Sequence, residues 1–276
     1  STSSRGLGDV YKRQQLDQLS LLAMQATLDA GKEILQVYNN EETLVDYKGD
    51  NSPLTQADTL AHLAIVKLLD TSGIPVLSEE GKHLPFEDRK HWTTLWIVDP
   101  LDGTKEFIKR NGEFTVNIAL VQEGSPILGV VYVPVSGELY LGVKGQGALK
   151  LKMDPDTSIT QDHLAMATSL PKSQERSFTA VGSRSHMNAE TEAFIEEYRT
   201  VHGEVCIISK GSSLKMCMVA EGTADVYPRF APTMEWDTAA GQAVVEAAGF
   251  TMVEKNSKTA LRYNKEDLLN PHFIVE

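Results

Sequence analysis

Hydrophobic residues recur every three or four positions in two stretches near the start of the chain. Between Gln15 and Tyr38 this spacing predicts an amphipathic helix that covers a core. A second helix is predicted from Thr55, whose hydroxyl can cap the first turn and places Asp58 inside that turn. The predicted buried stripe of this second helix is Leu60, Leu63, Ala64 and Leu68.

Short apolar runs predict strands further along the chain. Residues 74–77 and 95–98 predict two buried strands. Residues 114–121, 127–133 and 139–143 are separated by turn sequences and predict antiparallel hairpins. Strand and helix signals then alternate over residues 178–181, 189–198, 205–208, 214–220 and 238–248.

The order of these elements predicts an α/β (α+β) fold of two lobes. The N-terminal α+β lobe is expected over residues 14–159 and the C-terminal α/β lobe over residues 160–276. Residues 1–13 are rich in Ser, Gly and Arg and show no hydrophobic period, which is typical of a disordered or non-native leader. They take no part in the fold prediction.

Composition narrows the classes of function. The chain has 276 residues, 41% of them hydrophobic and 23% charged, which is typical of a globular protein with one large or two modest domains. Its formal net charge of −12 argues against a nucleic-acid polymer or an anionic membrane surface as the main partner. No apolar run approaches the roughly 20 residues that span a bilayer, and no signal-peptide pattern is visible, so a cytoplasmic protein is expected. Both cysteines, Cys206 and Cys217, are predicted to be buried and reduced.

The most informative stretch is DPLDGT, residues 99–104, which follows a predicted buried strand. Its proline and glycine favour a turn, so that Asp99 and Asp102 come to one edge with the Leu101 carbonyl between them. Mg²⁺ prefers oxygen ligands, and two carboxylates with one carbonyl suit half of its coordination shell. The stretch therefore predicts a metal site.

Two further acidic residues have a similar setting. Glu79 follows a predicted strand, and Asp237 is the predicted N-cap of an apolar helix. Taken singly, Asp237 fits a plain helix cap, Glu79 a solvated surface carboxylate, and DPLDGT an ordinary Asx turn. Their co-occurrence favours a metal site, because carboxylates gathered in one place repel one another and a bound dication removes that repulsion.

Three motifs in this order carry a family resemblance: Ser78-Glu79-Glu80, DPLDGT, and EWDTAAG at residues 235–241. Together they resemble the inositol-monophosphatase-like, lithium-sensitive metal phosphatases, from about Leu16 to the end of the chain. The resemblance implies a layered αβαβα sandwich of the sugar-phosphatase type with the active site between two lobes. Within that superfamily, residues 105–107, 110–120, 211–215 and 227–230 are similar to the 3'(2'),5'-bisphosphate nucleotidases of the bacterial CysQ type.

The resemblance also implies a ligand set for two or three Mg²⁺ ions. Glu79, Asp99 and the Leu101 carbonyl would hold one ion, and Asp99 would bridge to a second. Asp102 and Asp237 would complete the second site. Two ions held this way can bind a phosphate between them and supply a hydroxide nucleophile.

The attacking water needs a group that orients it and takes its proton. The resemblance assigns this role to Thr104 together with Glu79 or Asp58, and both alternatives stay open. Glu80 likewise stays open as the metal ligand in place of Glu79.

The resemblance further implies a set of substrate-binding residues. Lysine and arginine side chains among them would offset the charge of a second phosphate. Without the resemblance, His186 fits a surface histidine and Lys215 a solvated helix charge. The implied residues are Gly103, Thr104, Ser183, His186, Ser212, Lys215, Arg229 and Asp237.

We therefore predict magnesium-dependent hydrolysis of the 3'-phosphate of adenosine 3',5'-bisphosphate to AMP and phosphate, with the sulfated form of this nucleotide as a further substrate. An inositol or sugar monophosphatase with the same metal chemistry is the alternative enzyme. A non-catalytic nucleotide or metal sensor is the weakest alternative. The predicted partner is a small nucleotide; monomer or homodimer, and peripheral association with the inner membrane, stay open.

Overall fold

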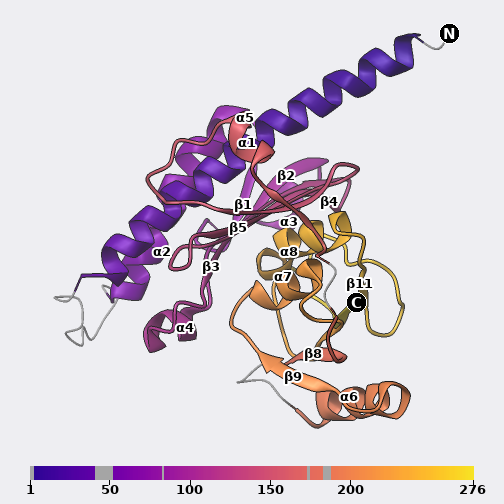
Figure 1. The fold of residues 1–276 in the computed structure, drawn as a ribbon. Coiled ribbons are helices and arrows are strands. Elements are labelled where there is room, and N and C mark those ends of the chain that lie inside the picture. Colours follow the sequence, from indigo (N-terminus) through magenta and orange to yellow (C-terminus); the bar gives the residue numbers. More distant parts are fainter. Residues whose placement is uncertain (1–2, 41–51, 83, 173–174, 183–187) are drawn as a thin grey trace.

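A mixed sheet of seven strands lies at the centre of the computed structural model, which describes residues 3–40, 52–82, 84–172, 175–182 and 188–276, and for residues 3–12 the backbone only (Figure 1). The strands lie in chain order across the sheet, and only the first two are parallel to each other. They are β1 (Val76–Ser78), β2 (Thr94–Asp102), β3 (Thr115–Gln122), β4 (Ser125–Val133), β5 (Glu138–Val143), β6 (Gly147–Lys152) and β7 (Thr168–Leu170).

Helices cover both faces of this sheet (Figure 1). One face carries α1 (Ser3–Tyr38) and α2 (Pro53–Leu69). The other face carries α7 (Leu214–Glu221) and α8 (Glu235–Ala247). The short helices η2 (Asp70–Ser72), α3 (Phe86–Arg89), α4 (Thr104–Lys109) and α5 (Gln161–Ala165) lie in the connections.

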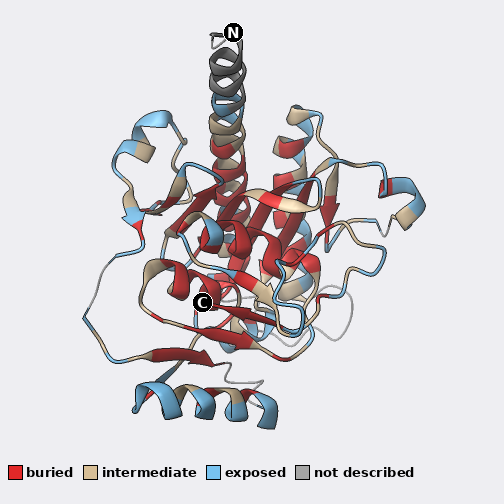
Figure 2. Ribbon diagram, turned by 90° about the vertical axis from the view of Figure 1, so that its right-hand side faces the viewer, coloured by how far each residue is buried: buried red, intermediate tan, exposed pale blue. Residues whose placement is uncertain are grey.

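Side chains alternate across each strand, which is why the sheet has two cores. In β2, Trp96 and Val98 belong to the core beneath α1 and α2, whereas Leu95 and Ile97 belong to the core beneath α7 and α8. All four are buried. Figure 2 shows the resulting band of buried residues through the sheet and its helices.

Two glycines let α8 approach the sheet closely. Gly129 of β4 and Gly142 of β5 are register partners. A Cβ at Gly129 would lie 2.3 Å from the Ala240 carbonyl oxygen, and one at Gly142 would lie 2.5 Å from the Cα of Val244. Any larger residue would therefore push away the helix whose first turn carries Asp237.

A second layer of strands lies beyond α7 and α8. The parallel pair β8 (Thr179–Gly182) and β9 (Cys206–Ser209) meets a three-stranded sheet through a parallel bridge between Ala180 and Val226. That sheet has the order β10 (Tyr227–Arg229), β12 (Phe273–Val275), β11 (Met252–Glu254), and α6 (Ala189–His202) packs outside it. The layers thus run helix, sheet, helix, sheet, helix, and the predicted αβαβα sandwich is confirmed.

Local details differ from the predictions in three places. The first helix begins at Ser3 rather than Gln15, although it ends at Tyr38 as predicted. The second helix begins at Pro53, and Ser52 rather than Thr55 caps it by accepting the Thr55 amide at 3.2 Å. Its buried residues are Ala57, Asp58, Ala61, Ile65 and Leu69.

The buried face of α2 is rotated relative to the predicted one because of the helix that packs against it. Small residues face inward where α1 and α2 meet closely, so Ala61 is fully buried while Leu63 is 58% exposed. The prediction rested on hydrophobicity alone and therefore placed the leucines on the buried face of the helix.

The cysteine prediction is half wrong, because Cys217 is buried whereas Cys206 lies exposed on β9. Among the described residues, no helix has the length and apolar character needed to traverse a bilayer.

Candidate active site

Parallel pairing of β1 and β2 places two predicted acids at the same edge of the sheet. Ser78 is the register partner of Val98, and the Glu79 amide donates to the Val98 carbonyl at 3.2 Å. Glu79 and Asp99 therefore follow equivalent positions in neighbouring strands, and Asp99 partly offsets the rise that burial causes in the pKa of Glu79. Glu79 lines the cleft described below and Glu80 does not.

An irregularity at the end of β2 turns both DPLDGT aspartates toward the cleft. The pairing with β3 shifts between Asp99 and Asp102, and the Leu101 amide donates to Asp99 Oδ1 at 3.1 Å. Gly103 then adopts a left-handed conformation with φ of 99°, and a Cβ there would lie 3.2 Å from the Cα of Phe114. This turn delivers Thr104 as the first residue of α4, exposed at the cleft.

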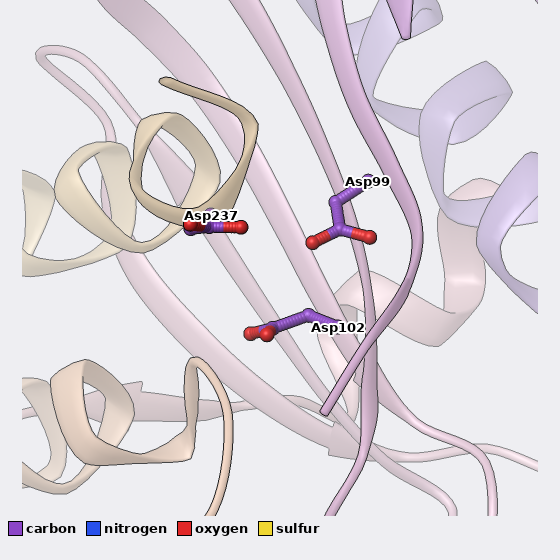
Figure 3. A group of neighbouring side chains, drawn as sticks. All are labelled: Asp99, Asp102 and Asp237. Carbon is purple, nitrogen blue, oxygen red and sulfur yellow. The ribbon is translucent and has the colours of Figure 1, made fainter. Parts of the chain in front are cut away.

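Asp237 reaches the same point from α8, on the opposite side of the cleft. The prediction that Asp237 is the helix cap is wrong. Asp237 is the third residue of the helix, where its Oδ2 accepts a hydrogen bond from the Met234 amide at 2.7 Å. The helix begins at Glu235, three residues before the expected first residue Thr238, and Glu235 is itself fully buried. Carboxylate oxygens of Asp99, Asp102 and Asp237 all lie within 4.8 Å of one another, and Figure 3 shows the three side chains converging.

Burial and mutual repulsion make these carboxylates hard to ionise without a cation. Burial, with Asp102 and Glu79 adding to it, raises the pKa of Asp99 well above its usual range. Burial also raises the pKa of Asp237 to about 7, with Asp102 as the main charged neighbour. The pKa of Asp102 is raised by burial too, although Lys215 and Ser213 oppose this. The three aspartates of the cluster offer carboxylate oxygens, which are the ligands that a hard divalent cation prefers.

Asp58 lies behind the cluster on α2. It is 8% exposed, and its Oδ1 has no hydrogen-bond partner among the described residues. Burial, followed by the charges of Glu80 and Glu79, raises its pKa to about 8. Asp58 does not line the cleft, and the predicted pairing of Asp58 with Thr104 stays a prediction.

A cleft of about 270 Å³ connects this acidic cluster to basic side chains. Ser183 and His186 lie outside the described residues. Of the remaining predicted site residues, all but Asp58 line the cleft. The predicted residues that line it are Glu79, Asp99, Leu101, Asp102, Gly103, Thr104, Ser212, Lys215, Arg229 and Asp237.

Two of the cationic side chains that line the cleft, Lys215 and Arg229, have few protein partners. Lys215 is 7% exposed, and its ammonium group donates to the Lys210 carbonyl at 3.4 Å. Burial lowers the pKa of Lys215 to about 8, partly offset by the charge of Asp102. Arg229 donates to the Pro232 carbonyl at 3.2 Å, and its buried Nε has no partner among the described residues. Burying the Lys215 cation with this little compensation is unfavourable unless an anion completes the site.

Several residues at the site were not predicted. Lys210, Ser213, Tyr227, Thr233 and Phe273 also line the cleft. Ser213 stands next to Ser212 in the sequence, but a serine at a helix start is common and carries no signal of its own.

The fold and the acidic cluster together define a metal-dependent phosphatase of layered α/β architecture. Residues 15–275 match the Inositol monophosphatase family, and the chain belongs to that family. The chain is 46% identical to the 3'(2'),5'-bisphosphate nucleotidase CysQ of Escherichia coli O6:H1, over 94% of this chain and 98% of the relative. It is 45% identical to the protein of that name from Escherichia coli K12, over the same shares.

Solved structures give the same result. The crystal structure of CysQ from Bacteroides thetaiotaomicron, a bacterial member of the family, is 54% identical, with a TM-score of 0.89 over 94% of this chain and 97% of that one. An inositol monophosphatase from Zymomonas mobilis shares the fold with a TM-score of 0.71 at 22% identity, over 94% of this chain and 92% of that one. The predicted family membership is confirmed.

Proposed function

We propose that this chain is a 3'(2'),5'-bisphosphate nucleotidase that hydrolyses the 3'-phosphate of adenosine 3',5'-bisphosphate to AMP and phosphate, and also acts on the sulfated form. One observation carries the proposal: a single cleft is lined both by the carboxylate cluster and by the cationic side chains of Lys215 and Arg229. A small molecule with two phosphates has one anionic group for a cation held by the cluster and another for these side chains. Relatives named as such nucleotidases at 46% and 45% identity support this substrate class.

The carboxylate cluster would hold two or three Mg²⁺ ions. Glu79, Asp99 and the Leu101 carbonyl would form one set of ligands, and Asp102 and Asp237 would complete the second set with Asp99. When bound, the ions supply charge stabilisation for the phosphate and a hydroxide at neutral pH. Thr104 would orient the attacking water, with Glu79 or Asp58 as the acceptor of its proton.

Lys215 and Arg229 would bind the phosphate that is not cleaved. Both offer donors in the cleft lining, and hydrogen bonds from charged groups are stronger than neutral ones. Ser212 and Gly103 also line the cleft. Ser183 and His186 complete the proposed nucleotide contacts on the strength of the sequence resemblance alone.

The substitution Lys215→Met tests the proposed contact of Lys215 with the uncleaved phosphate. We expect kcat/KM for adenosine 3',5'-bisphosphate to fall about 10- to 100-fold, because a charge-assisted hydrogen bond to the uncleaved phosphate is lost. Adenosine 3'-monophosphate lacks that phosphate, so its kcat/KM should change by less than about threefold on the same reasoning. Lys109→Met, on the exposed end of α4 outside the cleft lining, is the matched control.

Wild-type turnover decides the substrate class. A higher kcat/KM for inositol 1-phosphate than for adenosine 3',5'-bisphosphate would contradict the proposal in favour of an inositol phosphatase. Binding of the nucleotide with magnesium but without release of phosphate would instead indicate a sensor.

The cellular setting belongs to the same proposal. We infer a cytoplasmic enzyme with a small nucleotide as its partner, and the net charge of −12 supports the exclusion of nucleic-acid polymers. Light scattering in solution distinguishes monomer from homodimer, and flotation with anionic vesicles tests peripheral membrane association.

A further inference from the structure

A line of buried side-chain hydrogen bonds reaches the carboxylate cluster from behind. Thr115 Oγ1 donates to Asn117 Oδ1 at 3.0 Å, and Asn117 Nδ2 donates to Ser213 Oγ at 2.9 Å. Ser213 Oγ lies 2.9 Å from Asp102 Oδ2 and 3.0 Å from the backbone carbonyl of Asp237. Thr115, Asn117 and Ser213 are each at most 1% exposed.

The hydrogen-bond partners of Ser213 determine the direction in which its hydroxyl hydrogen points. A serine hydroxyl has one hydrogen to donate and two lone pairs to accept with. The Asn117 amide already occupies one lone pair, because its oxygen faces Thr115 and its nitrogen faces Ser213. The ionised Asp102 carboxylate is a stronger acceptor than the Asp237 carbonyl, so the hydrogen points to Asp102.

This arrangement leaves Ser213 no donor for a substrate. Its position instead joins three elements that come from distant parts of the sequence: Asp102 at the end of β2, Asn117 on β3, and Asp237 in the first turn of α8. Ser213 itself directly precedes α7. One hydroxyl thus contacts both an acid of the metal turn and the helix that supplies the opposing acid.

We propose that Ser213 is a positioning residue that holds the Asp102 carboxylate in place for metal binding, with Asn117 orienting its hydroxyl. This inference rests on the proposed function, because it takes Asp102 and Asp237 as metal ligands. Partners in the outer shell of a metal site fix the orientation of the inner ligands, and losing one costs about 10- to 100-fold in metal affinity or activity. Ser213 has the contacts of such a partner.

The test measures metal affinity directly on the full chain, with Mn²⁺ as a spectroscopic probe and Mg²⁺ by calorimetry. For Ser213→Ala we expect the affinity for the weaker-held ion to fall about tenfold or more. The Mg²⁺ concentration for half-maximal activity should rise by a similar factor, while kcat at saturating Mg²⁺ stays close to wild type. Ser213→Thr keeps the hydroxyl and should restore most of the affinity.

Ser72→Ala is the matched control, since it also deletes one hydroxyl with a side-chain partner. Ser72 accepts from Trp96 Nε1 at 3.0 Å and precedes β1, whereas the cleft lies beyond the other end of that strand. We expect this variant to bind metal like wild type. Should Ser213→Ala fail to fold, Asn117→Ala removes the donor to Ser213 and carries the same test.

The outcomes separate this inference from the function on which it rests. A wild-type chain that binds no divalent ion would contradict the proposed function itself. Metal binding by wild type together with unchanged affinity in Ser213→Ala, or an equal loss in Ser72→Ala, would overturn only the role of Ser213.

Discussion

Asp99 is the residue on which the proposed chemistry depends most. It is 1% exposed, it lies next to Glu79 on one side, and its oxygens face Asp102 and Asp237 on the other. A buried carboxylate in this position lowers the stability of the folded chain when no cation is bound, and a bound cation compensates its charge. The proposed metal binding therefore gives a reason for a buried charge that by itself lowers the stability of the folded chain.

The substitution Asp99→Asn removes that charge and keeps the shape. We expect turnover to fall by at least about 1,000-fold, because the carboxylate that would bridge the metal ions is lost. The metal-free variant should unfold at the wild-type temperature or above, since a neutral amide is easier to bury than a carboxylate. Steady-state kinetics and thermal unfolding in a chelator measure the two effects. Near-normal turnover would contradict the metal assignment.

At the scale of elements, the site depends on how closely α8 lies against the sheet. The glycine pair at positions 129 and 142 sets this distance, since added Cβ atoms would meet the helix backbone at 2.3 and 2.5 Å. Asp237 is carried by the same helix. A change in the sheet, remote from the cleft, should thus reach the metal ligands by moving α8.

Gly129→Ala tests this coupling. Overpacking should lower the free energy of unfolding by about 1–3 kcal/mol and should also weaken Mg²⁺ binding, because Asp237 moves with the helix. Gly145→Ala is the control: its Cβ meets open space, so only its left-handed backbone, at φ of 76°, is strained, by about 1–2 kcal/mol. Denaturant unfolding and calorimetry with Mg²⁺ report the two effects. Equal metal affinity in both variants would show that α8 does not transmit the strain.

At the scale of the whole molecule, the acids of the cleft come from both sides of the central core. Asp99 and Asp102 belong to the seven-stranded sheet, whereas Asp237 belongs to the helix layer beneath the second sheet. A cation shared by them would join the layers. The stability of the molecule should consequently depend on pH and metal together.

The pH dependence follows from the raised pKa values. An unfolded aspartate titrates near about 3.9, whereas folded metal-free Asp237 has a pKa of about 7. The folded chain binds the extra proton, so the contribution of Asp237 to the free energy of unfolding falls as pH rises from about 4 to about 7 and then levels off. Mg²⁺ binds the ionised form, so its stabilisation should grow over the same range.

Thermal unfolding between pH 5 and pH 8, with chelator and with Mg²⁺, measures this dependence. The Asp237→Asn variant isolates the contribution of one group, since all other titrating residues remain. We expect a flatter pH profile in chelator and less stabilisation by Mg²⁺ in that variant. Identical profiles for the variant and wild type would contradict the assignment of Asp237 to the cluster.

Much of this molecule was predictable from the sequence, because the information is local. Hydrophobic periods predicted α2, α6, α7 and α8, and apolar runs predicted strands β1 to β5, β8 and β9, within a few residues of their bounds. For α1 they predicted the C-terminal end but not the start. The turn at residues 99–104 follows from its own proline and glycine. The family resemblance rests on the same short motifs, and the match over residues 15–275 confirms it.

Only the tertiary structure decided which of these local pieces meet. A hydrophobic period says that a helix has a buried face but not which neighbour covers it, so the stripe of α2 was predicted one position away from where close packing against α1 puts it. Glu79 and Glu80 are equivalent in sequence, and the direction of the strand end places Glu79 in the cleft. Ser213 approaches Asp102 and Asp237 because packed layers bring distant segments within hydrogen-bond reach, and no local pattern contains that contact.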